Sequence, residues 1–304
     1  MKYFLLLFLV ITLGSSYAQN YEFGIKIGTT HYMGDLTETN IKLRQTKFGA
    51  GVLFRYNIWS RVNFKANLSY GSISGADSLK PGYYDPVNNT FYGKWAKYRN
   101  LSFKSHIFDA SLEVELNLKP NQGGHRKNYW TPYLLGGMAI FNFNPQAKYN
   151  GKWYDLQPLC TEGQETASPH AQKKYKLTQL AIPYGIGIKY SFRRPLTSDR
   201  INFDLWNIGV ELSSRKTFTD HLDDVGGYYP DYDILRASRG VDGSIAVALS
   251  DRQAEALAPL ENPVEAVLKR ETGSLRGNPE KMDQYMFIGI TITKTFRLTN
   301  VRLY

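Results

Sequence analysis

The acidic residues that follow position 219 form the densest group of chemically capable side chains in this sequence. The group consists of Asp220, His221, Asp223 and Asp224. Paired acids beside a histidine can activate water for hydrolysis. Carboxylates are also the hard-oxygen ligands that Ca²⁺ prefers, and aspartates often order turns and cap helices. The group therefore predicts a catalytic site, a cation site or an ordered loop.

The first two kinds of site are incomplete in this chain. A second acidic pair that would complete a protease site is not evident, and the aspartates, with Asp231 and Asp233, do not follow EF-hand spacing. We favour the structural role and expect no catalytic residue and no cofactor. Asp220, Asp223 and Asp224 stay a weak Ca²⁺ candidate. The other histidines are too scattered to predict a zinc site: His31, His106, His125 and His170.

The segments that must position this group alternate apolar and polar residues. Because successive side chains of a strand point to opposite faces, this alternation predicts β-strands with one apolar and one polar face. Eight such strands are predicted and are numbered here in chain order. Short connections join strand two to three, four to five, and six to seven, and the other connections are long. The predicted strands are 21–32, 48–58, 62–70, 103–118, 132–143, 180–192, 206–212 and 286–292.

An even number of antiparallel strands, with every long connection on one side, is typical of outer-membrane β-barrels. We expect an all-β fold: an eight-stranded antiparallel transmembrane β-barrel with long extracellular loops and both termini in the periplasm. A soluble eight-stranded barrel, with its apolar rows turned inward, is the alternative. Aromatic residues near the predicted periplasmic ends favour the membrane: Tyr56, Trp59, Trp130, Tyr133, Tyr190, Phe192 and Trp206.

Two segments are ambiguous. Around Phe103 and Ile107 the alternation runs in the opposite phase to the rest of strand four, which indicates either a bulge or a part that projects beyond the bilayer. Segment 132–143 is apolar on both faces, so its register is the least certain.

The polar rows predict a charged barrel interior. An eight-stranded barrel is only wide enough for its own side chains, and charges in such a space must pair to offset their desolvation. We therefore expect an ion-paired plug rather than a pore. The predicted lumen residues are Glu22, Lys26, Arg55, Lys65, Asp109, Glu113, Glu115, Lys189 and Glu211.

The start of the chain is typical of a secretory signal peptide, which we place at residues 1–18, with the barrel domain at 19–304. Lys2 precedes an apolar run at 4–13, and Ser16-Tyr17-Ala18 offers a cleavage site. No later apolar stretch has the length of a membrane-spanning helix. Cys160, the single cysteine, excludes an internal disulfide framework, and we interpret it as a buried small residue.

The chain is basic, with a net charge of +10, but no nucleic-acid-binding motif accompanies the charge. We expect lipid headgroups or an acidic partner to use it, and neither nucleic acid nor a small-molecule substrate. The connection at about 215–283 is too long for a plain loop and is expected to be partly ordered. Asn262-Pro263 and Gly273 predict a short helix within it.

The loops contain four distinctive motifs in order. The first is Tyr32-Met33-Gly34-Asp35-Leu36, which closes strand one. The second, in the third long loop, is Trp153 to Leu159, with Leu156 and Pro158, together with Thr161 to Gln164, with Gly163. The third is the segment 219–225, which includes Asp220, Asp223 and Asp224, and the fourth is Arg276-Gly277-Asn278-Pro279. Through them the whole mature chain resembles the PorG-type outer-membrane barrels associated with the Bacteroidetes type IX secretion system. The chain departs from the family with His221 in place of Tyr, Cys160 in place of Gly, and a longer insert near 254–270.

This resemblance implies a non-enzymatic part in exporting proteins across the outer membrane. The barrel would anchor or assemble a periplasmic ring of secretion proteins, with docking at the short turns 59–61, 120–129 and 194–200. A surface adhesin is the alternative, because the exterior loops are long and aromatic, and an outer-membrane hydrolase is a further one.

Overall fold

The computed structural model describes residues 20–37, 45–79, 83–85, 90–92, 99–120, 130–168, 170–195, 203–257 and 271–297. The predicted signal peptide, the predicted helix after Asn262 and most of the predicted docking turns at 120–129 and 194–200 lie outside the described residues.

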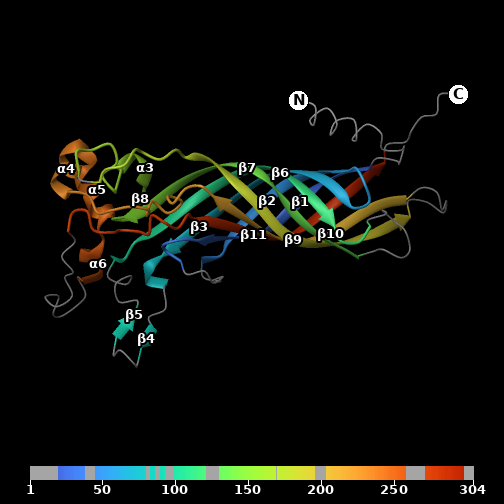
Figure 1. Ribbon diagram of the computed structural model, residues 1–304, viewed down its shortest axis with the longest axis horizontal. Coiled ribbons are helices and arrows are strands. Elements are labelled where there is room, and N and C mark those ends of the chain that lie inside the picture. Colours follow the sequence, from blue (N-terminus) through green and yellow to red (C-terminus); the bar gives the residue numbers. More distant parts are fainter. Residues whose placement is uncertain are drawn as a thin grey trace.

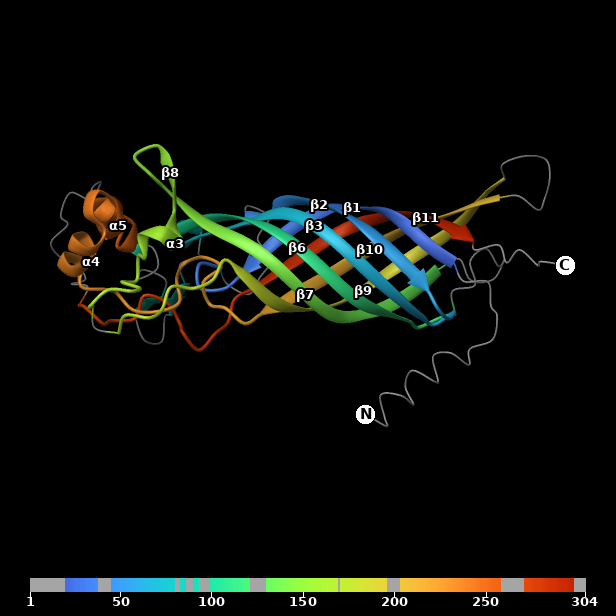
Figure 2. The ribbon, with the colours of Figure 1, turned by 90° about the horizontal axis from the view of Figure 1, so that it is seen from above.

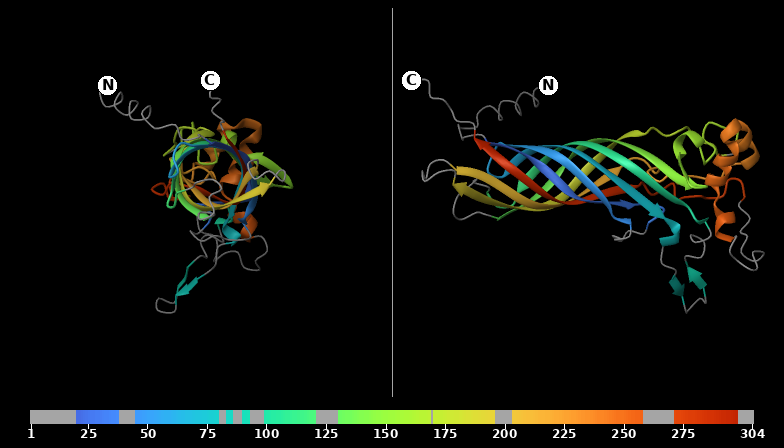
Figure 3. Two further views of the ribbon diagram at one scale, coloured as in Figure 1. Left: turned by 90° about the vertical axis from the view of Figure 1, so that its right-hand side faces the viewer. Right: turned by 180° about the vertical axis from the view of Figure 1, so that it is seen from behind.

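Eight long antiparallel strands form a closed barrel (Figures 1 and 3). Each strand pairs with the next long strand along the chain, and β1 pairs with β11 from Asn20↔Arg297 to Met33↔Gln284, which closes the wall. The predicted all-β, eight-stranded fold is confirmed. The strands are β1 (Asn20–Met33), β2 (Lys47–Asn57), β3 (Val62–Ala76), β6 (Ser102–Asn117), β7 (Trp130–Tyr149), β9 (Thr178–Pro195), β10 (Phe203–Thr217) and β11 (Gln284–Arg297).

Shorter elements gather beyond the end of the barrel that is opposite to the start of β1, as Figure 2 shows. We call this the cap end and the other the terminal end. None of the described helices is long and apolar enough to cross a membrane. The short elements are η2 (Asp77–Leu79), β4 (Tyr83–Asp85), β5 (Thr90–Tyr92), β8 (Lys152–Asp155), α3 (Leu156–Leu159), α4 (Tyr232–Ser238), η3 (Gly240–Asp242), α5 (Gly243–Ser250) and α6 (Gln253–Leu257).

The middle of the barrel is apolar outside and charged inside. On β1, for example, Phe23 and Ile27 are 53% and 47% exposed, whereas Glu22 and Lys26 are buried. The same alternation holds along the other long strands. Soluble proteins rarely expose so much contiguous apolar surface, and a belt of it around a barrel is the property of walls that face lipid.

Towards the cap end this arrangement reverses. On β6, Phe103 and Ile107 point inward and are buried, while Lys104 and His106 face outward. The pairing of β6 with β3 is continuous from Ser102 to Leu116, so the opposite phase there is no bulge: the strand continues beyond the apolar band. The inward side chains build a core like that of a soluble domain, which includes Leu36, Ile73, Leu101, Phe103, Ile107, Phe141, Phe143, Leu222 and Val225.

The ambiguous segment 132–143 lies in β7, and its register corrects one expectation. Tyr133 points into the lumen and is 1% exposed, so it is not one of the aromatic residues at the membrane boundary. Trp130 does face outward at the terminal end, where its ring centroid lies 4.8 Å from that of Tyr190. The sequence could not separate these roles because both faces of this segment are apolar.

Candidate functional site

Lys65 lies at the centre of an ion-pair network that fills the barrel. Its Nζ atom lies 2.8 Å from Glu113 and 2.6 Å from Glu211. The same atom lies 3.4 Å from Glu115. Lys26 also binds Glu211, at 2.9 Å, and Tyr133 donates to this carboxylate from 2.9 Å. Four strands, β1, β3, β6 and β10, thus send carboxylates and cations to one point inside the wall.

The network continues in both directions from this centre. Towards the terminal end, Arg55 binds Glu22 and lies 2.8 Å from Glu115. Towards the cap end, Arg215 lies 3.4 Å from Asp109. Ser111 donates to Glu113 at 2.9 Å and Tyr285 donates to Asp109 at 2.8 Å, so these buried acceptors have neutral partners as well.

All nine predicted lumen residues lie inside, each no more than 2% exposed. Arg215 joins them and was missed, because the alternation was followed only to Leu212, whereas β10 continues to Thr217. With Arg215, five cations balance five anions among the described lumen residues. They are Lys26, Arg55, Lys65, Lys189 and Arg215 against Glu22, Asp109, Glu113, Glu115 and Glu211.

Among the described residues, the void found beside this network is small. A void of about 10 Å³ lies between Asp109, Arg215 and Tyr285, which is at the limit of what one water molecule needs. We therefore predict that the purified barrel gives no steady conductance in a planar bilayer. A stable single-channel current from the unmodified protein would contradict the plug.

The loops close the cap end around two buried arginines. Arg276 is 1% exposed, binds Glu162 at 3.1 Å and donates to the Ser250 carbonyl at 3.0 Å and to the Asp224 carbonyl. Glu162 in turn accepts the backbone N–H groups of Gly226 and Gly227, both at 3.0 Å. The third and fourth long loops are thereby joined through charge-assisted hydrogen bonds, which are the strong ones.

Arg99 ties the first two long loops to the fourth. Its guanidinium forms a bidentate ion pair with Asp77, with both distances 2.7 Å. It also donates to the backbone carbonyl of Arg276 at 2.6 Å and to that of Asp35 at 3.1 Å. We call the described loop residues held by Arg99 and Arg276 the cap.

The glycines of two predicted motifs permit close approach within the cap. A Cβ atom on Gly277 would lie 2.4 Å from the Asp35 carboxylate, and one on Gly34 would lie 1.8 Å from that of Asp283. Asp35 also accepts the backbone N–H of Asn278. The first and fourth motifs, about 240 residues apart in the chain, are therefore in contact.

Some residues of the motif in the third long loop are buried in the cap and others are exposed on its surface. Leu156 is buried in the apolar core, whereas Pro158 and Trp153 are exposed. Gly163 has a φ of +72°, which favours glycine. Cys160 is buried with a φ of +52°, so the position where the resemblance implies Gly does have a left-handed backbone.

The acidic group lies inside the cap, and its members have different partners. Asp224 accepts the Thr161 hydroxyl and, at 2.7 Å, the Tyr175 hydroxyl. Asp223 accepts the backbone N–H of Val225 at 2.9 Å, and neither oxygen of Asp220 has a hydrogen-bond partner among the described residues. No group of three or more Asp, Glu, His or Cys side chains could hold a metal ion within the part of the chain that the structure describes.

Asp223 shares one tyrosine with Asp283. The Tyr32 hydroxyl lies 2.6 Å from Asp223 and 3.0 Å from Asp283. It can donate only one proton, and a proton on either carboxyl group would satisfy the second contact. Burial raises the pKa of both carboxyls, and the nearby charges of Asp223 and Asp220 raise that of Asp283 further. Sequence reasoning missed Asp283, which follows no recognisable motif.

The acidic group predicts that the cap loses stability as pH rises. Burial, with Asp223, Asp35 and Glu162 nearby, raises the pKa of Asp220 to about 9 against the opposing effect of Lys281. Burial also raises the pKa of Asp224 to about 6, despite the nearby Arg276. Because the folded cap holds these protons more tightly than the unfolded chain, their stabilising contribution is complete below about pH 4 and falls as pH rises to about 9.

We expect protease cleavage in the cap to be faster at pH 9 than at pH 6, measured with a protease active at both values. Asp220→Asn imitates the protonated form and should reduce this difference. A cap that becomes more resistant between pH 6 and pH 9 would contradict the prediction.

A closed eight-stranded wall, apolar outside and ion-paired inside, defines a transmembrane β-barrel of the outer-membrane class. The chain belongs to the family described as a domain of unknown function, DUF6089, which matches residues 1–239. This span includes seven of the eight barrel strands and leaves β11 outside.

Three similar solved structures come from Yersinia pestis and Pseudomonas aeruginosa. The attachment invasion locus protein Ail of Y. pestis is 7% identical, with a TM-score of 0.37 and coverage of 92% of this chain and 100% of that chain. The N-terminal β-barrel domain of OprF from P. aeruginosa is 11% identical, with a TM-score of 0.33 and coverage of 92% and 98%. The outer membrane protein OprG of P. aeruginosa is 9% identical, with a TM-score of 0.34 and coverage of 92% and 97%. No curated protein matches the chain.

Proposed function

We propose that this barrel is a non-enzymatic outer-membrane component of a protein secretion machine of the type IX class. It anchors or helps to assemble the periplasmic ring of that machine. In this proposal the terminal end and its short turns face the periplasm, and the cap faces the cell exterior. The ring proteins dock at the turns, and the apolar band binds the lipid of the outer membrane.

The observation that carries the proposal is that the interior of the barrel is filled and one of its two mouths is covered. The lumen holds a balanced ion-pair network with a void of about 10 Å³, and the cap covers one mouth with buried ion pairs. A barrel without a passage acts through its surfaces, as an anchor does. The loop motifs on which the resemblance rests also include the residues that hold the cap together.

A non-enzymatic role also agrees with the geometry of the acidic group. A residue that activates water must reach both water and substrate. Asp223 and Asp224 are instead no more than 1% exposed and are occupied by hydroxyl and N–H donors. In this proposal Asp223 and Asp224 order the loops.

Deletion of the gene should remove many unrelated proteins from the culture medium at once. Asp223→Asn/Asp224→Asn should restore secretion, because asparagine keeps an acceptor oxygen for the buried donors and removes the carboxylates that catalysis would need. The proteins in the medium are compared by mass spectrometry. Normal secretion in the deletion strain, or a double variant that folds but does not restore it, would contradict the proposal.

Two insertion variants can locate the docking surface. A short tag between Ser60 and Arg61 extends the turn that is closed by hydrogen bonds between Trp59 and Val62. A matched tag between Asn150 and Gly151 extends the turn between β7 and β8 at the cap end. Only the first should reduce co-purification of periplasmic proteins.

A surface adhesin remains the second candidate, and one observation favours it. The β7–β8 hairpin presents Trp153, 51% exposed, at the cap end, and exposed aromatic residues are common in binding surfaces. Normal secretion with loss of surface binding in Trp153→Ser would decide for the adhesin.

A further inference from the structure

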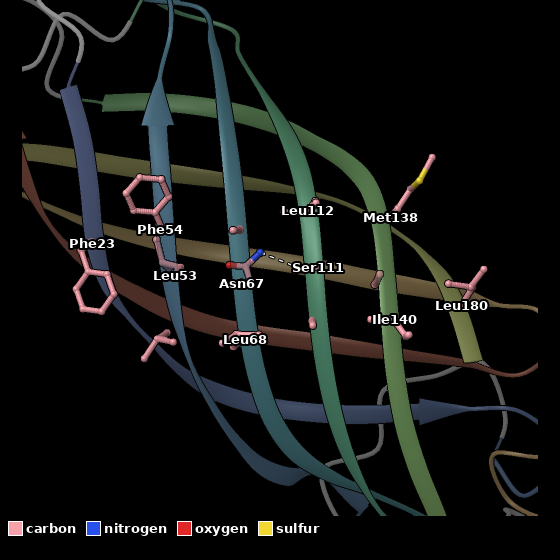
Figure 4. Close-up of a pocket in the computed structure, with 14 residues that line it drawn as sticks. Phe23, Leu53, Phe54, Asn67, Leu68, Ser111, Leu112, Met138, Ile140 and Leu180 are labelled. Atoms are coloured by element: carbon pink, nitrogen blue, oxygen red, sulfur yellow. Dashed lines mark hydrogen bonds between the residues drawn. The ribbon is translucent and has the colours of Figure 1, made fainter. Parts of the chain in front are cut away.

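The lipid-facing wall contains a hollow of about 640 Å³ over β2, β3, β6 and β7 (Figure 4). Its floor is low because Ala66 and Ala110 stand among large neighbours. Ala66 pairs with Phe54 and Leu112, and Ala110 pairs with Leu68 and Ile140. The volume lies within the range of about 300–1,000 Å³ that is typical of small-molecule sites.

The hollow runs obliquely across the wall. In Figure 4, the Phe23 and Phe54 rings border one end, and Met138, Ile140 and Leu180 border the other. A second hollow of about 350 Å³ shares Phe54, Ala66 and Leu112 with the first and continues towards the terminal end. Together they form an apolar groove. Ile140 of β7 and Leu180 of β9 border the end of the groove that lies nearer the cap.

A cationic and aromatic patch lies beyond the apolar band, on β6, β7 and β8. Lys104 of β6 is 5.7 Å from the ring centroid of Trp153, and Lys148 of β7 pairs directly with Trp153. Asp155 is the acidic neighbour, and its carboxylate accepts the side-chain amides of Asn144 at 2.9 Å and Gln146 at 2.6 Å. Lys104 lies six residues from Ala110, which is about 20 Å along a strand.

We propose that the groove and the patch together hold one anionic lipid from the leaflet at the cap end. An acyl chain lies against Ala66 and Ala110, a headgroup phosphate binds Lys104 and Lys148, and Trp153 lies beside the two lysines. Under the orientation proposed above, this is the outer leaflet. The inference does not depend on the secretion role.

Shape and charge both favour a lipid as the occupant. The groove is only as deep as the difference between alanine and its larger neighbours, whereas a transmembrane helix is about 10–12 Å across. A single acyl chain fits such a depth. Two lysines beside a tryptophan match a phosphate at the membrane boundary, where amphipathic aromatic rings and cations are favoured.

The test counts the lipids that the purified barrel retains, by native mass spectrometry. Phosphatidylglycerol is the probe, phosphatidylcholine with the same acyl chains tests the need for a net negative headgroup, and inorganic phosphate tests for binding of the headgroup alone. We expect one phosphatidylglycerol to be retained at least tenfold more strongly than phosphatidylcholine, with no competition from millimolar phosphate.

Two pairs of substitutions separate the two parts of the site. Ala66→Leu/Ala110→Leu fills the groove, and Lys104→Gln/Lys148→Gln removes the charges. Each pair should lower retention of phosphatidylglycerol at least tenfold. A variant that carries both pairs should lose one lipid per barrel and no more, because the two parts of the site hold the same molecule. Ala50→Leu and Lys216→Gln are matched controls outside the site and should have no effect. All four variants change outward-facing residues, and gel migration with and without heating verifies their folding.

Four outcomes would overturn the proposal. Retention that does not change when the groove is filled would show that the chain does not lie there. Equal retention of phosphatidylcholine, or competition by free phosphate, would show that the lysines do not select an anionic lipid. A disulfide-linked dimer from Met138→Cys in membranes, lost in the groove-filling variant, would assign the groove to a second copy of the chain.

Discussion

Replacing Lys65 by methionine is expected to lower the free energy of unfolding of the barrel by about 3–5 kcal/mol. Lys65 is the only described cation that contacts Glu113, Glu115 and Glu211 together, at 2.8, 3.4 and 2.6 Å. Methionine has a side chain of similar length but no charge. The three carboxylates then stay buried with one positive charge fewer to balance them. A urea titration in lipid vesicles, followed by heat-modifiable gel migration, measures the change.

Two further variants show whether the loss is electrostatic. Lys104→Met removes an outward-facing lysine near the cap and should change the free energy of unfolding by less than about 1 kcal/mol. Adding Glu113→Gln to Lys65→Met removes one of the uncompensated charges and should recover part of the loss. Equal effects of Lys65→Met and Lys104→Met would refute the central position of Lys65.

Replacing Arg276 by methionine is expected to open the cap while the barrel stays folded. The change leaves Glu162 and the backbone carbonyls of Asp224 and Ser250 without the buried guanidinium. Breaking a buried ion pair in this way costs about 3–5 kcal/mol. Protease cleavage within residues 218–257 should accelerate by at least a hundredfold, with heat-modifiable migration unchanged.

Arg236→Met is the matched control for this variant. Arg236 pairs with Asp233 at 3.2 Å, but the two side chains are 53% and 93% exposed, and such surface pairs contribute about 0–1 kcal/mol. Its cap should therefore stay resistant. A cap that resists protease equally well in both variants would show that Arg276 does not hold the loops together.

The barrel could be predicted from the sequence because its wall obeys a local rule. The alternation that puts Glu22 and Lys26 on one face of β1 and Phe23 and Ile25 on the other follows from the geometry of one strand. The same rule failed where both faces of a strand are apolar, as at Tyr133. It also stopped short at Leu212, so Arg215 was missed.

The cap could be predicted only as a group of motifs. Aspartates near position 220 indicate order, and Asp231 does cap α4 by accepting the N–H groups of Asp233 and Ile234. The partners of Asp224, however, come from another loop, since Thr161 is 63 residues away. Such long-range contacts leave no periodic signal in the sequence.

The long-range pairing of the lumen has a consequence for how the chain enters the membrane. Lys26 lies on the first strand, and its partners are Glu211 on β10, 185 residues later, and the Phe287 ring on β11, 4.1 Å from Nζ. If hairpins inserted one after another, Lys26 would face hydrocarbon unpaired, at a cost of about 2–4 kcal/mol for a cation at the bilayer midplane. Full insertion therefore has to coincide with the arrival of the last strands. The charges that stabilise the finished wall also set the timing of its biogenesis.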